Sequence, residues 1–160
     1  MSFSLPKNIQ KKVDNEIKDA YQIENFQFDE KIIDSEIVKA LPSNFGKDHF
    51  FEIKSNQKLL GYAYVSKAAS KTDQFDYLVL LDMELIVKKA KVLVYREDYG
   101  GEIGSKRWLQ QFIGKSQYDQ LKYQDNIVAI SGATISVRSM TNAMNDLLKS
   151  LKILHTKNIL

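Results

Sequence analysis

Four small residues, Ser131 to Thr134, join a short apolar run to a stretch with helical spacing of apolar residues. Hydroxyl side chains at such a junction commonly cap a helix, and Gly132 can supply a left-handed turn. The pattern by itself favours this structural interpretation. A second interpretation is an anion site, because the free N–H groups at a helix start carry partial positive charge.

The charges around this junction favour the anion site. No acidic residue occurs between Asp125 and Asp146, and Arg138 falls in the first turn of the expected helix. A helix start with a cation and no carboxylate is unfavourable unless an outside anion, most often phosphate, compensates it. Arg138 is then a possible counter-charge to that anion. The residues expected to shape the site are two small residues and three hydroxyls, namely Gly132, Ala133, Ser131, Thr134 and Ser136.

Two other kinds of active site receive no support from the sequence. The segment Gly100 to Lys106, GGEIGSK, has the order Gly-Ser-Lys where a P-loop needs Gly-Lys-Ser or Gly-Lys-Thr, and its spacing is wrong. Neither His49 nor His155 has a local context that suggests the base of a nucleophilic triad.

The composition restricts the partners and the cofactor. The chain has 160 residues, 44% of them hydrophobic, which suits one compact domain with a real core. Its net charge of +3 comes from 23 basic and 20 acidic residues without a long basic run, so nucleic acid is not an expected partner. There is no cysteine and there are two distant histidines, so no metal is expected. A redox cofactor would be organic or would belong to a partner.

Targeting signals are not evident. No stretch approaches the roughly 20 apolar residues of a membrane span. The first twelve residues lack the apolar core of about 7–15 residues that a leader peptide needs. We therefore expect either a cytoplasmic protein or a chain whose leader is not included.

The first third of the chain predicts mainly helices. Apolar residues at every fourth position predict an amphipathic helix over residues 5–21, with Ser4 as its cap and Pro6 in its first turn. The apolar stripe is narrow, so this helix should lie across the body of the protein. Residues 23–33 are ambiguous between strand and helix, and residues 34–41 predict a short helix that a proline stops.

The remaining two thirds predict a sheet and more helices. Expected are a hairpin over 49–68, paired strands over 75–95, a glycine-containing loop over 96–104, a short helix over 105–114, a short strand over 126–130, and a long amphipathic helix from Ser136 to beyond Leu151. Short connections between the strands imply antiparallel pairing. The sequence therefore predicts a single α+β domain, an antiparallel sheet flanked by helices.

Residues 131–136, SGATIS, resemble the flavin-attachment motif of the FMN-binding domain family. This family includes the flavin subunits of the Rnf and sodium-pumping NADH:quinone reductase complexes. Its motif is Ser/Thr-Gly-Ala-Thr, one further residue, and Ser/Thr. The resemblance implies that Thr134 carries flavin mononucleotide (FMN) through a phosphoester bond installed by a flavin transferase, with Ile135 as the intervening residue.

A second segment of the chain is similar to the family. Relatives have two strands followed by a Glu-Thr-Pro-Gly-Leu-Gly loop and a helix, and this chain has EDYGG at the corresponding place. Glu97 and Gly100 match, whereas Asp98, Tyr99 and Gly101 replace the Thr, Pro and Leu. The resemblance implies that this loop holds the flavin ring, with glycines for close approach, Tyr99 for stacking and Glu97 for orientation. Without the resemblance, an ordinary acidic turn would be preferred.

The similarity runs from about residue 61 to residue 151. We therefore interpret residues 61–154 as an FMN-binding core and residues 1–60 as an N-terminal helix and lead-in elements of the same compact domain. Relatives usually have an Asp six residues before the acceptor threonine, where this chain has Val128, and Val137 replaces a second hydroxyl residue. Covalent attachment and tight non-covalent binding of FMN both remain open.

The expected function is electron transfer by bound FMN, with a flavin transferase for maturation and redox partner proteins that could be membrane-bound. The alternative is a small-ligand or protein-interaction module that kept the fold and lost the flavin. A flavoenzyme with its own substrate is less favoured, because no histidine or cysteine is near the expected site. The resemblance implies an extracytoplasmic location, with a cytoplasmic one as the alternative.

Overall fold

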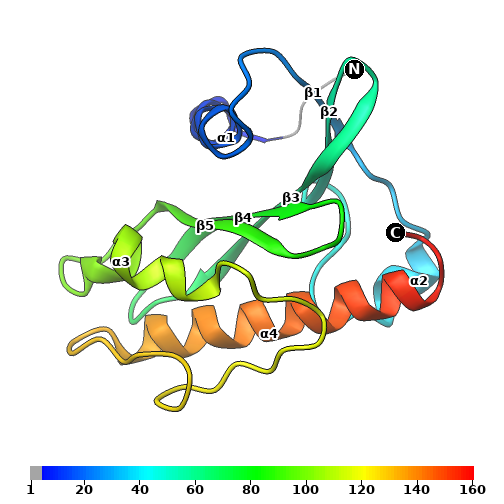
Figure 1. The fold of residues 1–160 in the computed structure, drawn as a ribbon. Helices are drawn as coiled ribbons and strands as arrows, with labels where there is room; N and C mark the ends of the chain where they lie inside the picture. Colours follow the sequence, from blue (N-terminus) through cyan, green and yellow to red (C-terminus); the bar gives the residue numbers. More distant parts are fainter. Residues whose placement is uncertain (1–4) are drawn as a thin grey trace.

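The computed structural model describes residues 5–160, so the expected cap Ser4 lies outside the described residues. It contains one five-stranded antiparallel sheet whose spatial order, β1-β2-β3-β4-β5, is the order along the chain (Figure 1). The strands are β1 (Gln27–Glu30), β2 (Phe50–Ser55), β3 (Lys58–Ala69), β4 (Gln74–Asp82) and β5 (Val87–Val94). The predicted α+β fold with an antiparallel sheet is confirmed.

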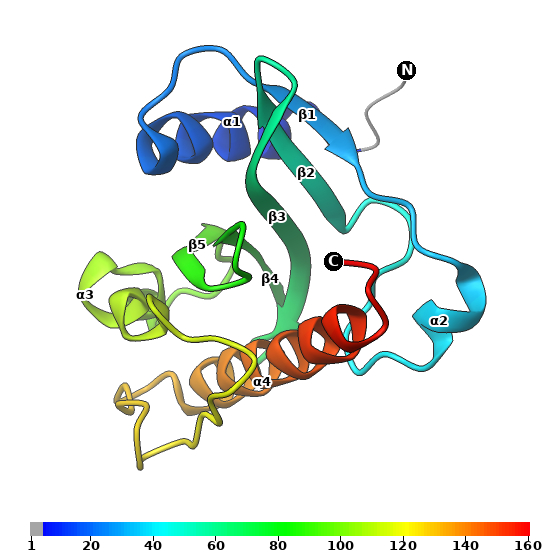
Figure 2. The same ribbon diagram turned by 45° about the vertical axis from the view of Figure 1, so that its right-hand side comes forward.

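Helices cover both faces of this sheet. The long helix α4 (Thr134–Thr156) crosses one face, and α1 (Lys7–Tyr21) lies across the other (Figures 1 and 2). The shorter elements are α2 (Ser35–Lys39), the 3-10 turn η1 (Gly101–Gly104), α3 (Lys106–Leu109) and the 3-10 turn η2 (Gln110–Phe112). No helix within residues 5–160 has both the length and the apolar character to span a bilayer.

The central strands are buried on both faces, and their side chains divide between two cores. On β4, Phe75, Tyr77, Val79 and Leu81 pack into the core shared with α4, whereas Leu78 and Leu80 pack into the core shared with α1. This is the alternation that a strand requires, because successive side chains point to opposite faces. Since both faces are covered, apolar residues occupy both sets of positions.

The two predicted hairpins are present. Asn56 and Gln57 join β2 to β3, and both have positive φ angles of 52° and 66°, as the favoured two-residue hairpin turns need. β4 and β5 form the second hairpin. Residues 23–33, which were ambiguous, contribute the edge strand β1, and Asp34 caps α2 by accepting a hydrogen bond from the Glu36 N–H at 2.8 Å.

The narrow apolar stripe of α1 packs across the sheet, as predicted. Ile9, Val13 and Ile17 are buried in the core on that face. The helix begins one residue after Pro6, which is the N-cap, so Pro6 does not lie in the first turn as predicted. At the other end, the Tyr21 hydroxyl donates to the Leu81 carbonyl of β4 at 2.6 Å.

The predicted strand over 126–130 is wrong. Only Ile127 forms an isolated bridge, with Tyr123. The backbone of Val128 instead bonds to side chains, since its N–H donates to Gln111 Oε1 and its carbonyl accepts from Trp108 Nε1, both at 2.7 Å.

The outer edge of β5 is partly covered, because the backbone of residues 114 and 115 forms hydrogen bonds with the backbone of Val87. Helix α4 then begins at Thr134, two residues earlier than predicted.

Gly61 supports a testable prediction about stability. A Cβ atom there would lie 2.0 Å from the Leu81 carbonyl oxygen and 2.7 Å from the Tyr21 hydroxyl. We expect Gly61→Ala to lower the free energy of unfolding by about 1–3 kcal/mol, as overpacking of a rigid site does. Urea denaturation measures this. The control is Gly101→Ala, whose Cβ would have no neighbour within 4 Å and should change stability by less than about 0.5 kcal/mol. Equal stability of the two variants would contradict the prediction.

Candidate functional site

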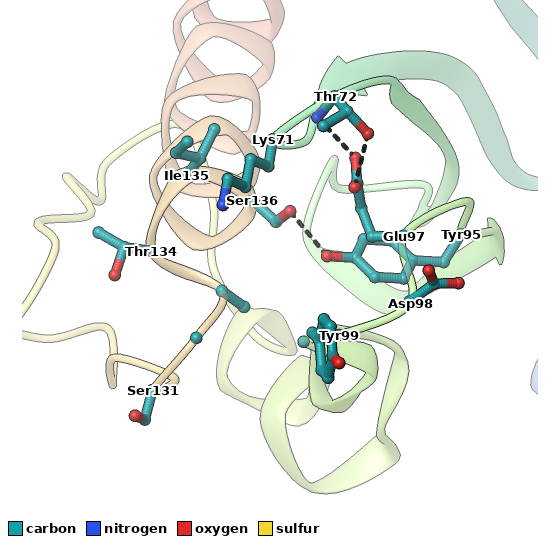
Figure 3. Close-up of a pocket in the computed structure, with 13 residues that line it drawn as sticks. Lys71, Thr72, Tyr95, Glu97, Asp98, Tyr99, Ser131, Thr134, Ile135 and Ser136 are labelled. Atoms are coloured by element: carbon teal, nitrogen blue, oxygen red, sulfur yellow. Dashed lines mark hydrogen bonds between the residues drawn. The ribbon is translucent and has the colours of Figure 1, made fainter.

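A pocket of about 810 Å³ lies where three segments meet: the start of α4, the loop after β5 and the turn between β3 and β4 (Figure 3). It brings together ten of the twelve residues predicted from the sequence. These are Glu97, Asp98, Tyr99 and Gly100 from the loop, and Ser131, Gly132, Ala133, Thr134, Ile135 and Ser136 from the turn and the helix. Gly101 and Arg138 do not line it. Lys71, Thr72 and Tyr95 complete the lining and were not predicted.

The start of α4 has no side-chain cap. Ala133 occupies the N-cap position with φ −133° and ψ 30°, no side chain bonds to the end of the helix, and the first turn has no acidic residue. The alternative interpretation of the hydroxyls as a helix cap is therefore wrong, whereas the left-handed turn that it also proposed is present, since Gly132 has a φ of +79°. An uncapped helix start presents N–H donors with partial positive charge, which is an arrangement that binds anions.

The three hydroxyl side chains of the motif have different environments. Ser136 is buried, and its Oγ lies 2.9 Å from the Tyr95 hydroxyl in a hydrogen bond that joins α4 to the end of β5. Ser131 and Thr134 are exposed and line the pocket. Thr134 is the first residue of α4, so its hydroxyl is accessible beside the uncapped helix start.

Gly100 allows the loop to pack against the turn before α4. Its φ of +81° is left-handed, and a Cβ at this position would lie 2.7 Å from the Cβ of Ala133. The backbone approach that glycine permits here is therefore to Ala133, within the protein. Gly101 begins the 3-10 turn η1 and has open space around it.

Glu97 fastens the loop to the turn between β3 and β4. Its carboxylate accepts hydrogen bonds from Ser70 Oγ at 2.5 Å, from the Thr72 N–H at 2.8 Å and from Thr72 Oγ1 at 2.8 Å. These bonds lower the pKa of Glu97 to about 2, the hydroxyl of Ser70 having the largest effect, followed by the N–H and hydroxyl of Thr72. The structure thus gives Glu97 a role within the protein that the sequence did not indicate.

The charges of the lining differ from those expected. Arg138 is exposed and its guanidinium lies over the ring of Tyr123, 4.7 Å from the centroid. The cation among the lining residues is Lys71 instead. Nothing in the local sequence SKTD singled out Lys71 and Thr72, because hairpin turns commonly contain such residues. The sequence could have indicated Tyr95 as a lining residue, because it ends the predicted strand directly before the loop.

The lining can therefore bind an anion and a flat ring. The start of α4, Lys71 and the hydroxyls of Ser131 and Thr134 supply groups that attract an anion, and Tyr95 and the 83%-exposed Tyr99 provide aromatic surface. The lining includes no histidine, the usual general acid or base near neutral pH.

The low pKa of Glu97 makes a prediction about pH. Its pKa is depressed from the ordinary value of 4.5 to about 2, so ionised Glu97 stabilises the fold above pH 4.5, and this contribution falls away between pH 4.5 and 2. Glu97→Gln should lower the Tm at pH 6, and its difference from the unsubstituted protein should shrink towards pH 2. Thermal unfolding followed by circular dichroism measures both.

The matched control is Glu102→Gln, at an exposed glutamate in the adjacent 3-10 turn. This variant should follow the unsubstituted protein over the same pH range. A Tm difference for Glu97→Gln that stays constant from pH 6 to pH 2 would show that the ionised carboxylate does not stabilise the fold through these hydrogen bonds.

Comparison with known proteins gives the family. Residues 71–149 match the family model described as FMN-binding domain, and this range contains every residue that lines the pocket. A search of curated proteins gave no match. The match confirms the resemblance noted in residues 131–136, and it makes FMN the cofactor that the pocket is expected to bind. Through residues 71–149, the chain belongs to the FMN-binding domain family.

Proposed function

We propose that this protein is an electron carrier whose FMN is attached through its phosphate to Thr134. The observation that carries the proposal is the position of Thr134, an exposed hydroxyl at the first residue of an uncapped helix and in the wall of a large pocket. A phosphodiester retains one negative charge. The helix start would stabilise that charge without a capping side chain.

The pocket fits FMN in size and in chemistry. Its volume of about 810 Å³ is that of a small-molecule site, typically about 300–1,000 Å³. Tyr99 can cover one side of a flat ring, and Ala133 and Ile135 add apolar surface. The fastening of the loop by Glu97 and by the Tyr95–Ser136 hydrogen bond would hold these walls in place.

The lining suits a carrier better than an enzyme. FMN supplies one- and two-electron redox chemistry when bound, and the protein holds and orients it. Of the lining residues, Asp98 is an exposed carboxylate that forms no ion pair within residues 5–160. In this proposal a flavin transferase matures the protein, and redox partner proteins, including membrane-bound ones outside the cytoplasm, exchange electrons with it.

The alternative is a module that has the fold without the flavin, and Val128 is the observation in its favour. The Val128 side chain is 65% exposed, and its backbone bonds do not depend on the side chain. The departure from the usual Asp would therefore affect recognition by the transferase and leave the fold unchanged. Covalent attachment is the step that Val128 puts at risk.

Thr134→Val tests the proposed linkage. Co-expression with a flavin transferase should give a yellow protein whose intact mass is increased by one FMN less one water. The variant should keep the unmodified mass, because it lacks the attacking hydroxyl. Thr156→Val, which makes the same change at an exposed threonine at the other end of α4, outside the pocket, is the control and should be modified normally. A colourless unsubstituted protein of unmodified mass, unable to bind added FMN, would remove the proposal.

Val128→Asp tests the recognition step separately. The position is exposed, so the substitution should change the free energy of unfolding by less than about 0.5 kcal/mol. We expect the modified fraction, measured by intact mass after a fixed reaction time with the transferase, to increase. An unchanged or smaller fraction would show that the transferase does not read this position.

A further inference from the structure

We propose that Lys71 makes the pocket selective for phosphorylated flavin, by pairing with the phosphate at the start of α4. This inference rests on the proposed FMN site, although it does not require the covalent bond to Thr134. It assigns to the turn between β3 and β4 a role in discriminating FMN from riboflavin, which has the same ring and no phosphate.

The position of Lys71 is the first argument. It lines the pocket from the β3–β4 turn, and Figure 3 shows its side chain extending towards the first turn of α4. Within residues 5–160 its ammonium group has no carboxylate partner in an ion pair, whereas Arg138 already lies over Tyr123. Lys71 is therefore the lining cation that remains available to a ligand.

The distribution of charge in the lining is the second argument. Two carboxylates also line the pocket, but both lie on the far side from α4. Glu97 bonds to Ser70 and Thr72, and Figure 3 shows the Asp98 carboxylate turned away from α4, beyond Tyr95. Positive charge from Lys71 and from the helix start is thus concentrated at one end of the pocket. An anionic group binds at that end and a neutral ring occupies the rest.

The anchoring of the turn is the third argument. Ser70 and Thr72 flank Lys71 directly, and both bond to the Glu97 carboxylate. Ser70 is also buried. The backbone of Lys71 is therefore fixed relative to the loop after β5, although its side chain is exposed. A fixed backbone lowers the conformational entropy lost when the ammonium group pairs with a phosphate.

Flavin affinity tests the inference on the unmodified chain, purified without a flavin transferase and checked by intact mass. Quenching of flavin fluorescence gives the Kd for FMN and for riboflavin. The unsubstituted protein should bind FMN more tightly. Lys71→Met should weaken FMN binding by about tenfold, as expected for the loss of one charge-assisted contact, and leave riboflavin binding unchanged. Lys71→Arg should keep most of the preference.

Lys67→Met is the matched control, because Lys67 is an exposed lysine of β3 that does not line the pocket and its loss changes the net charge equally. It should bind both flavins as the unsubstituted protein does. Raising the salt concentration should weaken FMN binding to the unsubstituted protein more than to Lys71→Met, since salt screens the ion pair. Circular dichroism shows whether each variant is folded.

The failure of each idea gives a different result. If the unsubstituted protein binds FMN and folded Lys71→Met binds it equally well, the assignment of Lys71 is overturned and the proposed function stands. Equal losses of FMN and riboflavin would also overturn it, because the lysine would then act on the ring or on the pocket as a whole. If the unsubstituted protein binds neither flavin, the inference about Lys71 is overturned, and the proposed function is lost only if co-expression with a flavin transferase also leaves the mass unmodified.

Discussion

The packing of α4 against the sheet is the constraint on which the site depends. Met140, Met144, Leu147 and Leu151 are fully buried, so the helix cannot slide or rotate without exposing a large apolar surface. Its first residue, Thr134, is therefore fixed beside the loop after β5. Because no side chain caps this end and its first turn has no acidic residue, its free N–H groups carry partial positive charge that favours an anion.

Three contacts then connect the walls of the pocket. Gly100 packs against Ala133, the Tyr95 hydroxyl bonds to Ser136, and the Glu97 carboxylate holds the β3–β4 turn. Each contact joins segments that are more than 20 residues apart in the chain. A flat ligand held between such segments would keep a fixed position and a fixed polarity. The membership of the FMN-binding domain family agrees with this arrangement.

Charged and polar groups are distributed unevenly between the two sides of the pocket. Anion-binding groups lie at the α4 end, and the carboxylates of Glu97 and Asp98 lie on the opposite side (Figure 3). Tyr99, which also lines the pocket, is largely exposed. In the proposed function, the phosphate of FMN would bind at the α4 end of this pocket.

Local patterns in the sequence determined most of the helices and strands, as well as the motif at residues 131–136. The helices α1 and α4, both hairpins and the turn at Gly132 follow from apolar periodicity and turn residues, which act over a few positions. The tertiary structure decided what depends on distant partners: residues 126–130 are not a strand, because Trp108 and Gln111 bond to Val128. It also placed Lys71 in the pocket. Spacing along a chain cannot show such choices, because they depend on which segments the packed sheet and helix bring together.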